Sequence, residues 1–241
     1  MSDSPKLNLP VFEIFKDKRI VLASSSPRRK AILARVGFHP DIVPSTFKED
    51  LSHELFNYDL TKYPIATCTE KAKEVFLRLT HDENEKQFKK PDLVISADTV
   101  VIFPPSSESH QGHVGRILEK PGTKEEQLKI LNEMNGKQCE IVTGISILVP
   151  AKNLQGVYKI HSTSASTLVQ FANNSKDFIQ AYVDSEEGLD RSGGFATQDM
   201  GGVLVESIHG DYDNVAGFPS SHFWRWIHQL YDQAIFDKAW N

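Results

Sequence analysis

Cysteine is scarce in this chain, since Cys68 and Cys139 are the only two among 241 residues. They form neither a Cys-x-x-Cys pair nor a zinc-site spacing, so a reduced, cytoplasmic chain is the simpler interpretation. No apolar run approaches the length of a membrane span, and residues 1–10 lack the apolar core of a signal peptide. The sequence therefore predicts a cytoplasmic protein with no membrane partner.

An excess of positive charge is also missing. Lysine and arginine number 27 against 32 aspartates and glutamates, which gives a net charge of −5. This balance argues against broad nucleic-acid binding, so the positive charge that matters must be local. The 9 histidines are scattered, and the two that share a polar loop, His110 and His113, make a poor metal site.

What the sequence does contain is an alternation of strand-like and helix-like segments, which is typical of an α/β fold. With 39% hydrophobic residues, the chain can bury a sizeable core. We expect an N-terminal extension at 1–18 and a single domain at 19–241. Strands are predicted at 19–23, 92–103, 140–149, 158–161, 163–171 and 202–208. Helices are predicted from Pro27 to Gly37, at 67–79, from Thr123 and at 176–183, and a final helix is predicted with Ser220 or Ser221 as its cap.

Two capping boxes support these helix starts, namely Thr67 with Glu70 and Thr123 with Glu126. Between the helices and strands lie two polar segments. The charged stretch 81–90 is expected to loop out, and the stretch 104–115, rich in Pro, Ser and His, is expected to be a flexible insertion.

The most informative segment runs from the first strand into the first long helix. An apolar strand is followed by a serine cluster with Ser24 and Ser26, then by Pro27, Arg28 and Arg29. A serine can cap the helix, and proline suits its first turn. The free N–H groups and the dipole there favour a phosphate, and two arginines add charge-assisted donors. Taken alone, the pattern also fits a capped surface helix with solvated arginines.

Asp98 interrupts an otherwise apolar strand at 92–103. Burying an acid is costly unless it is paired, bound to a metal or placed at a strand end. Asp98 is therefore either a functional acid or a buried aspartate held by backbone N–H groups.

Further motifs follow in order along the chain. They are Glu-Lys-Ala at 70–72, Ser-Ala-Asp-Thr-Val at 96–100, Glu-Lys-Pro at 119–121, Val-Thr-Gly at 142–144, Gly-Gly-Phe-Ala-Thr-Gln at 193–198, Gly-Asp-Tyr-Asp-Asn at 210–214 and Val-Ala-Gly-Phe-Pro at 215–219. With the serine and arginine segment, this ordered set resembles the Maf family of nucleoside triphosphate pyrophosphatases, over most of the chain. The resemblance implies an elongated mixed sheet flanked by helices, with a cleft between two lobes, as in the Maf and inosine triphosphatase-like fold.

The resemblance also implies roles for individual residues. Asp98 aligns with the catalytic acid, which takes a proton from the attacking water or holds the metal that activates it. Glu49 would hold Mg²⁺ or Mn²⁺ together with Asp98, unless the assignment shifts by one residue to Asp50. Lys71 and Lys120 would supply positive charge to the substrate phosphates; without the resemblance they are ordinary solvated lysines.

Base recognition is implied for Gln198, whose amide has both a donor and an acceptor and can match thymine or uracil. Thr99 is expected to shape the same pocket. The chain departs from the usual family pattern here. Arg191-Ser192 replaces Lys-Ala, Ala196-Thr197 replaces Gly-Ile, and Asp199 replaces Gly. These changes bear on base specificity more than on catalysis.

The function expected from this resemblance is metal-dependent hydrolysis of nucleoside triphosphates, with dTTP, UTP and modified pyrimidine nucleotides as substrates. Two alternatives remain open. One is a regulatory module that binds nucleotides without hydrolysing them, and the other is a nucleotidyl transferase that uses the same anion site. The family often forms dimers, which is the only basis for expecting a homodimer.

Overall fold

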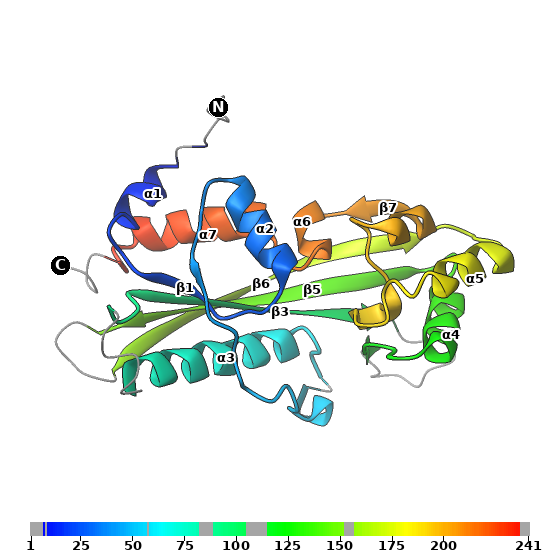
Figure 1. Ribbon diagram of the computed structural model, residues 1–241, viewed down its shortest axis with the longest axis horizontal. Helices are drawn as coiled ribbons and strands as arrows, with labels where there is room; N and C mark the ends of the chain where they lie inside the picture. The colour runs from blue at the N-terminus through cyan, green and yellow to red at the C-terminus, as the bar shows by residue number, and fades with distance from the viewer. Residues whose placement is uncertain are drawn as a thin grey trace.

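A seven-stranded mixed sheet runs the length of the molecule (Figure 1). The computed structural model describes residue 7 and residues 9–56, 58–81, 89–104, 115–151 and 157–236. The strands are β1 (Ile20–Leu22), β2 (Asp41–Ile42), β3 (Leu93–Phe103), β4 (Arg116–Leu118), β5 (Gln138–Pro150), β6 (Tyr158–Phe171) and β7 (Val205–His209). Their order is β2-β1-β3-β5-β6-β7, with β4 also paired to β3. β1 runs parallel to β2 and β3, and the other pairs are antiparallel. The expected α/β class and mixed sheet are confirmed.

β5 and β6 pair over their full lengths, from Gln138 opposite Gln170 to Pro150 opposite Tyr158. The prediction of two separate strands at 158–161 and 163–171 was therefore wrong. Ser162, between the two predicted strands, has its hydroxyl 2.8 Å from the hydroxyl of Ser146 on the neighbouring strand. A polar residue that finds a partner across the ladder does not interrupt a strand.

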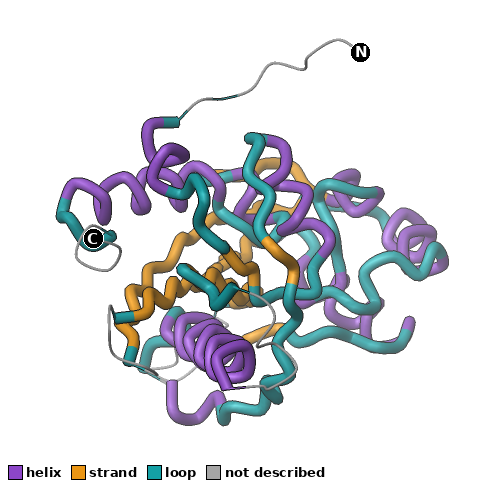
Figure 2. The backbone as a smooth tube through the Cα atoms, turned by 60° about the vertical axis from the view of Figure 1, so that its left-hand side comes forward, coloured by secondary structure: helices purple, strands orange, loops and turns teal. Residues whose placement is uncertain are grey.

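Helices cover both faces of the sheet (Figures 1 and 2). The α-helices are α1 (Pro10–Ile14), α2 (Pro27–Arg35), α3 (Lys62–His81), α4 (Lys124–Met134), α5 (Lys176–Asp184), α6 (Tyr212–Val215) and α7 (Ser220–Asp232). Short 3₁₀ turns occur at η1 (His53–Phe56), η3 (Ser192–Gly194) and η4 (Met200–Leu204). Helices α1, α2 and α7 pack on one face of the sheet, and α3 packs on the other. Helices α4 and α5 form a second core with the far end of the sheet, so two groups of helices share one continuous sheet.

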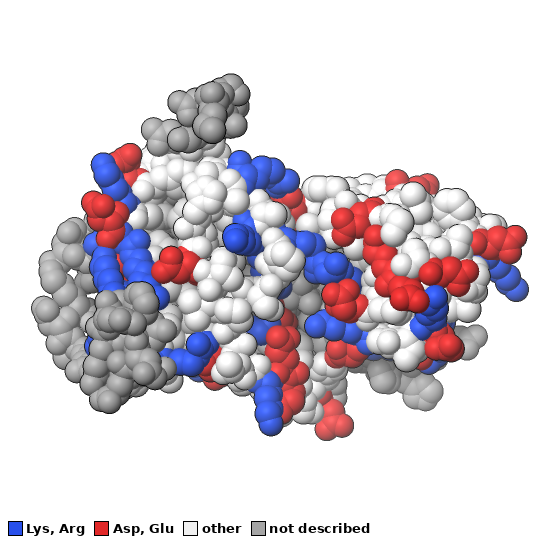
Figure 3. Space-filling model, viewed as in Figure 1, with Lys and Arg blue, Asp and Glu red and all other residues white. Residues whose placement is uncertain are grey.

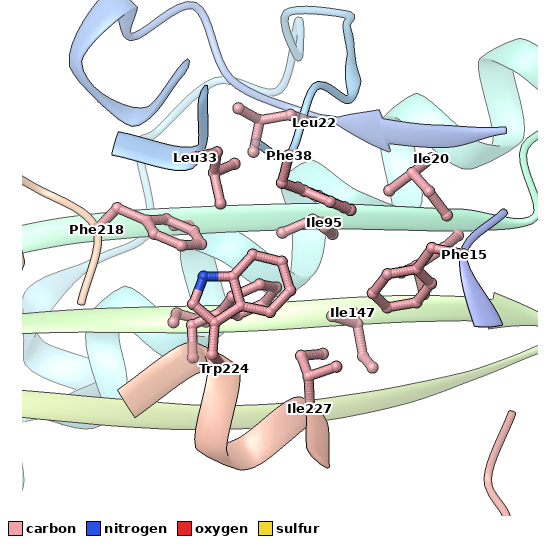
Figure 4. Close-up of a cluster of buried hydrophobic side chains, with 14 of the residues drawn as sticks. Phe15, Ile20, Leu22, Leu33, Phe38, Ile95, Ile147, Phe218, Trp224 and Ile227 are labelled. Carbon is pink, nitrogen blue, oxygen red and sulfur yellow. The ribbon is translucent and has the colours of Figure 1, made fainter. Parts of the chain in front are cut away.

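The larger core lies between the sheet and the helices α1, α2 and α7 (Figure 4). Phe38 and Trp224 meet edge to face at its centre, with ring centroids 5.1 Å apart. Val11 and Phe15, from the segment predicted as an N-terminal extension, are buried in the same core. Residues 9–15 therefore belong to the folded body, since such burial of apolar side chains stabilises the fold.

Some of the helix starts predicted from local sequence agree with the structure, and others differ because of tertiary packing. The predicted cap at Thr123 is confirmed, because its hydroxyl accepts a hydrogen bond from the Glu126 N–H at 3.3 Å. The cap at Thr67 was wrong: α3 begins at Lys62, and Thr67 is buried inside it. Pro64 lies in the first turn, where its missing N–H costs nothing. The predicted cap at Ser220 or Ser221 was also wrong: α7 begins at Ser220, and the residue at its cap position, Pro219, makes no side-chain cap hydrogen bond.

Most of the loop at 81–90 and the insertion at 104–115 lie outside the described residues. Among the described helices, none is long and apolar enough to cross a membrane.

One edge of β3 is left open midway along its length. β1 pairs with residues 93–95 and β4 with residues 101–103, whereas β5 covers the opposite edge from 94 to 102. Within the described strands, residues 96–100 therefore have a neighbour on one side only. Asp98 lies in this gap.

Candidate active site

A cavity of about 610 Å³ opens at this gap. Its volume lies within the range of small-molecule sites. The residues predicted from the sequence that line it are Ser24, Ser26, Arg28, Arg29, Glu49, Lys71, Asp98, Thr99, Lys120 and Gln198. Asp50, the alternative to Glu49, is not among the lining residues. The fold thus brings residues from distant parts of the chain to one place. Lys and Arg side chains gather near the middle of the face seen in Figure 3, with carboxylates beside them.

Asp98 and Thr99 are neighbours on β3, so their side chains point to opposite faces of the sheet. Asp98 meets α3 through Lys71, and Thr99 meets α2 through Arg29. Because no described strand covers this part of the β3 edge, both side chains line the same cavity. The gap at the β3 edge therefore gives side chains from both faces of the sheet access to one cavity.

Lys71 holds two carboxylates together. Its Nζ lies 2.8 Å from Asp98 Oδ1 and 2.7 Å from Glu49 Oε1. Lys71 and Asp98 are both 7% exposed, whereas the Glu49 side chain is half exposed. A buried ion pair is favourable only with close geometry and further partners, and here the ammonium has both carboxylates. Asp98 is therefore a paired acid at the cavity wall.

Gly144 explains how α3 comes so close to the sheet. It stands opposite Asp98 in the β3–β5 ladder. A Cβ at this position would lie 2.5 Å from the backbone of Pro64 and of Ile65, near the start of α3. Only glycine permits this approach, which places Lys71 within reach of Asp98.

At the start of α2, Ser26 caps the helix, and its hydroxyl accepts from the Arg29 N–H at 3.5 Å. The Arg29 guanidinium donates to Gly217 O at 2.9 Å, to Ser24 Oγ at 3.1 Å and to Thr99 Oγ1 at 3.1 Å. Burial lowers the pKa of Arg29, while the nearby Asp98 charge opposes the shift. A guanidinium nevertheless keeps its charge in a protein. Arg29 thus ties α2, β3 and the loop at 217 together.

The Gly-Asp-Tyr-Asp-Asn motif at 210–214 holds in place the segment that leads to Gly217. The buried Asn214 side chain donates to Ile141 O at 2.9 Å and to Ala165 O at 3.2 Å, which fixes α6 to β5 and β6. The chain then turns toward Gly217, which has a φ of +104° that favours glycine and whose carbonyl accepts from Arg29.

Arg28 differs from Arg29 in its surroundings. Its Nη1 atom is buried and has no hydrogen-bond partner among the described residues. Arg28 also lines the cavity, at a helix start whose N–H groups favour an anion. A buried donor without a partner is costly, so this atom is well suited to bind an oxygen of a ligand.

The segments 119–120 and 190–198 also contribute residues to the lining of the cavity. Lys120 is exposed at its edge, and Arg191 lies beside Asp190, 3.3 Å away. The Gln198 amide nitrogen donates to Asp199 Oδ2 at 3.0 Å. Because a carboxylate only accepts hydrogen bonds, this contact fixes which end of the amide faces Asp199.

Tyr63 is a lining residue that sequence reasoning missed. Burial raises its pKa, and the charges of Asp98 and Glu119 raise it further. It lies in the first turn of α3, ahead of the predicted helix start, so no local motif marked it. Cys68, one turn before Lys71, is buried, and this burial raises the pKa of its thiol, which disfavours the nucleophilic thiolate at neutral pH.

A divalent metal fits the acids of this site. Glu49 and Asp98 converge on a single cation, the Lys71 ammonium. Mg²⁺ is commonly held by one or two carboxylates together with waters and substrate phosphates, which matches this donor set. Among the described residues, no group of three or more His, Cys, Asp or Glu could hold a metal alone, so the remaining ligands would have to come from outside the chain.

Comparison with known sequences decides the family. The sequence profile of the family described as "Maf-like protein" matches residues 19–230. The chain belongs to the Maf family.

Curated relatives of this Maf-family chain share a common description. "dTTP/UTP pyrophosphatase" of Schizosaccharomyces pombe is 33% identical, with 92% of this chain and 88% of the relative covered. The protein of the same name from Pyrococcus furiosus is 36% identical over 84% of this chain and 90% of the relative. "Probable bifunctional dTTP/UTP pyrophosphatase/methyltransferase protein" of Homo sapiens is 38% identical over 92% of this chain, which spans only 34% of that longer protein.

Among solved structures, a nucleoside-triphosphatase from Mycobacterium abscessus matches at 13% identity, covering 64% of this chain and 75% of its own. The TM-score of 0.33 is too low to add to the assignment.

Proposed function

We propose that this chain hydrolyses nucleoside triphosphates to a monophosphate and diphosphate, and that dTTP and UTP are its preferred substrates. The descriptions of its Maf-family relatives support both parts. The structural observation that carries the proposal is the single cavity that contains both the start of α2, with the buried Arg28 Nη1 atom, and the Lys71–Asp98 pair. A phosphate chain bound at Arg28 would lie in the same cavity as a carboxylate able to act on water.

In this mechanism a water molecule attacks the α-phosphorus, forming a new P–O bond while the bond to the bridging oxygen of the β-phosphate breaks. Asp98 accepts a proton from the water, and diphosphate leaves with the bridging oxygen. Lys71 holds the Asp98 carboxylate in place at 2.8 Å. Arg28 and Lys120 both line the cavity and offset the negative charge of the phosphates.

Glu49 and Asp98 would hold a Mg²⁺ or Mn²⁺ ion. Bound there, the ion would polarise phosphate oxygens and offset their charge. The chain's own residues supply the rest, because Lys71 keeps the two carboxylates together and the open β3 edge admits the substrate.

A product assay separates this activity from the two alternatives. We expect dTTP and UTP with Mg²⁺ to give the monophosphate and diphosphate in equal amounts. Anion-exchange chromatography of the reaction mixture resolves and quantifies both products. A regulatory module would leave the nucleotide intact. A transferase would release diphosphate without free monophosphate. Either result would overturn the proposed activity. Asp98→Asn protein, prepared in parallel, measures any hydrolysis that comes from contaminating enzymes.

The base would be read by Gln198, with its amide nitrogen held by Asp199. Held this way, the amide oxygen can accept from the N3–H of thymine or uracil. Cytosine has an acceptor at N3, and flipping the amide to match it would turn its oxygen against the Asp199 carboxylate. We therefore expect kcat/KM for dTTP and UTP to exceed that for CTP by roughly 1–3 kcal/mol, about ten- to a hundredfold. We expect a preference over purine nucleotides as well, and this expectation rests on the descriptions of the relatives.

Comparing wild type with Gln198→Ala tests this assignment. The preference should shrink in the variant, and it should persist in Gln180→Ala, a matched change on α5 outside the cavity. A wild-type preference for GTP or 7-methyl-GTP would contradict the pyrimidine assignment while leaving the hydrolysis itself intact.

The two arginines of α2 should separate binding from stability. Arg28→Ala should raise KM for the triphosphate about tenfold, because one charge-assisted contact is lost, with little change in Tm. Arg29→Ala should lower Tm, since each hydrogen bond from a charged group contributes about 1.5–3 kcal/mol and Arg29 makes several within the protein. Steady-state kinetics and calorimetry on both variants check this. An unchanged KM in Arg28→Ala would remove the phosphate role of that side chain.

A further inference from the structure

The loop that carries Glu49, residues 43–50, is fastened to α3 at one carboxylate. Three loop groups donate to Glu74: Ser45 Oγ at 2.8 Å, the Thr46 N–H at 2.9 Å and Thr46 Oγ1 at 2.9 Å. Both oxygens of the carboxylate are used. A single side chain of the helix thus satisfies one backbone N–H and two hydroxyls of this turn.

Arg78, one helical turn further, completes the attachment. Its Nε donates to Glu74 Oε1 at 2.7 Å, and its Nη2 donates to Pro44 O at 2.7 Å. Burial alone would raise the pKa of Glu74, but hydrogen bonds from Arg78, Thr46 and Ser45 lower it to about 2. The carboxylate therefore stays ionised at neutral pH, and its stabilising contribution is lost only as the pH falls from about 4.5 toward 2.

Glu74 and Lys71 are three residues apart on α3 and so lie on the same side of the helix. The loop is anchored at Glu74 and then reaches Lys71 through Glu49, whose Oε1 lies 2.7 Å from the ammonium. The Glu49 side chain is half exposed, so surrounding packing does little to place it. Its position depends on where the loop backbone is held.

We propose that Glu74 is a positioning residue, whose carboxylate sets the loop so that Glu49 contacts Lys71, the residue that pairs with Asp98 in the active site. The role of Glu49 in turnover rests on the proposed function, whereas the attachment of the loop does not.

The test compares Glu74→Gln with a matched control, Glu70→Gln. Glu70 lies on the same helix and also forms an ion pair, with Lys73 at 2.6 Å, which lies on α3 rather than on the loop. At neutral pH the Thr46 amide should lose its protection from hydrogen exchange in Glu74→Gln and keep that protection in Glu70→Gln. Turnover of dTTP should fall about tenfold in Glu74→Gln, mostly in kcat with KM nearly unchanged, because displacing an active-site group by a fraction of an ångström slows the reaction rather than weakening binding.

A second variant guards against loss of folding. Thr46→Val removes one loop donor and changes no residue of α3. We expect it to lower kcat in the same way as Glu74→Gln, but by a smaller factor. Unchanged exchange at Thr46 in Glu74→Gln would show that the carboxylate does not hold the loop. Faster exchange with unchanged kcat would show that the attachment does not position Glu49. If wild type hydrolyses no nucleotide, the proposed function fails, and the exchange data alone still decide whether Glu74 fastens the loop.

Discussion

Replacing Asp98 with Asn is expected to lower kcat for dTTP by about 10²-fold or more, the usual scale for loss of an acid–base group. The amide preserves the shape of the side chain but cannot take a proton from water. Nucleotide binding should persist, because Arg28 and the start of α2, which also line the cavity, are unchanged. Rapid-quench measurement of diphosphate release, with binding followed by calorimetry, checks both parts.

The same substitution should also cost stability. Lys71 is nearly buried and would keep only Glu49 as an anionic partner among the described residues. Weakening one charge-assisted hydrogen bond costs about 1–3 kcal/mol, which for a chain of this length lowers Tm by several degrees. Asp177→Asn is a suitable control, since this exposed residue lies on α5 outside the cavity. Near-normal turnover in a folded Asp98→Asn variant would end the assignment of Asp98 as the acid.

Local signals predicted those features that depend on a few adjacent residues. The start of α2, the cap at Thr123 and the long β3 and β5 strands follow from spacing and capping chemistry. The start of α3 could not be placed in this way. Its first turn is held by the close approach to Gly144, which lies far along the chain on β5.

Contacts between distant residues also decide the roles of the site residues. The motifs indicated Arg28 and Arg29 equally, yet only the fold shows that Arg29 is occupied by Ser24, Thr99 and Gly217. Nor did any motif indicate that Lys71 would join Asp98 to Glu49, because helix and strand spacing do not say which elements meet. Glu74 belongs to no motif, and its importance becomes visible only through the loop packed against it.

Removal of divalent cations is expected to abolish hydrolysis without unfolding the protein. Glu49 and Asp98 are the acids suited to a metal, and both are already paired with Lys71. The fold therefore does not need the ion, and Tm should change little on addition of a chelator. The ion must compete with the ammonium for the two carboxylates, so we expect weak binding to the free protein and tighter binding when a triphosphate adds its own oxygens.

Calorimetry separates these contributions. Titration of Mg²⁺ into the protein should give little heat alone and a clear binding curve in the presence of a non-hydrolysable dTTP analogue. Glu49→Gln should weaken that curve, whereas Glu70→Gln, at a partly exposed position of α3 that does not line the cavity, should leave it unchanged. Full turnover after exhaustive chelation would exclude a catalytic metal at these carboxylates. The Lys71 ammonium, which lies within 2.8 Å of both, would then be the cation that balances their charge.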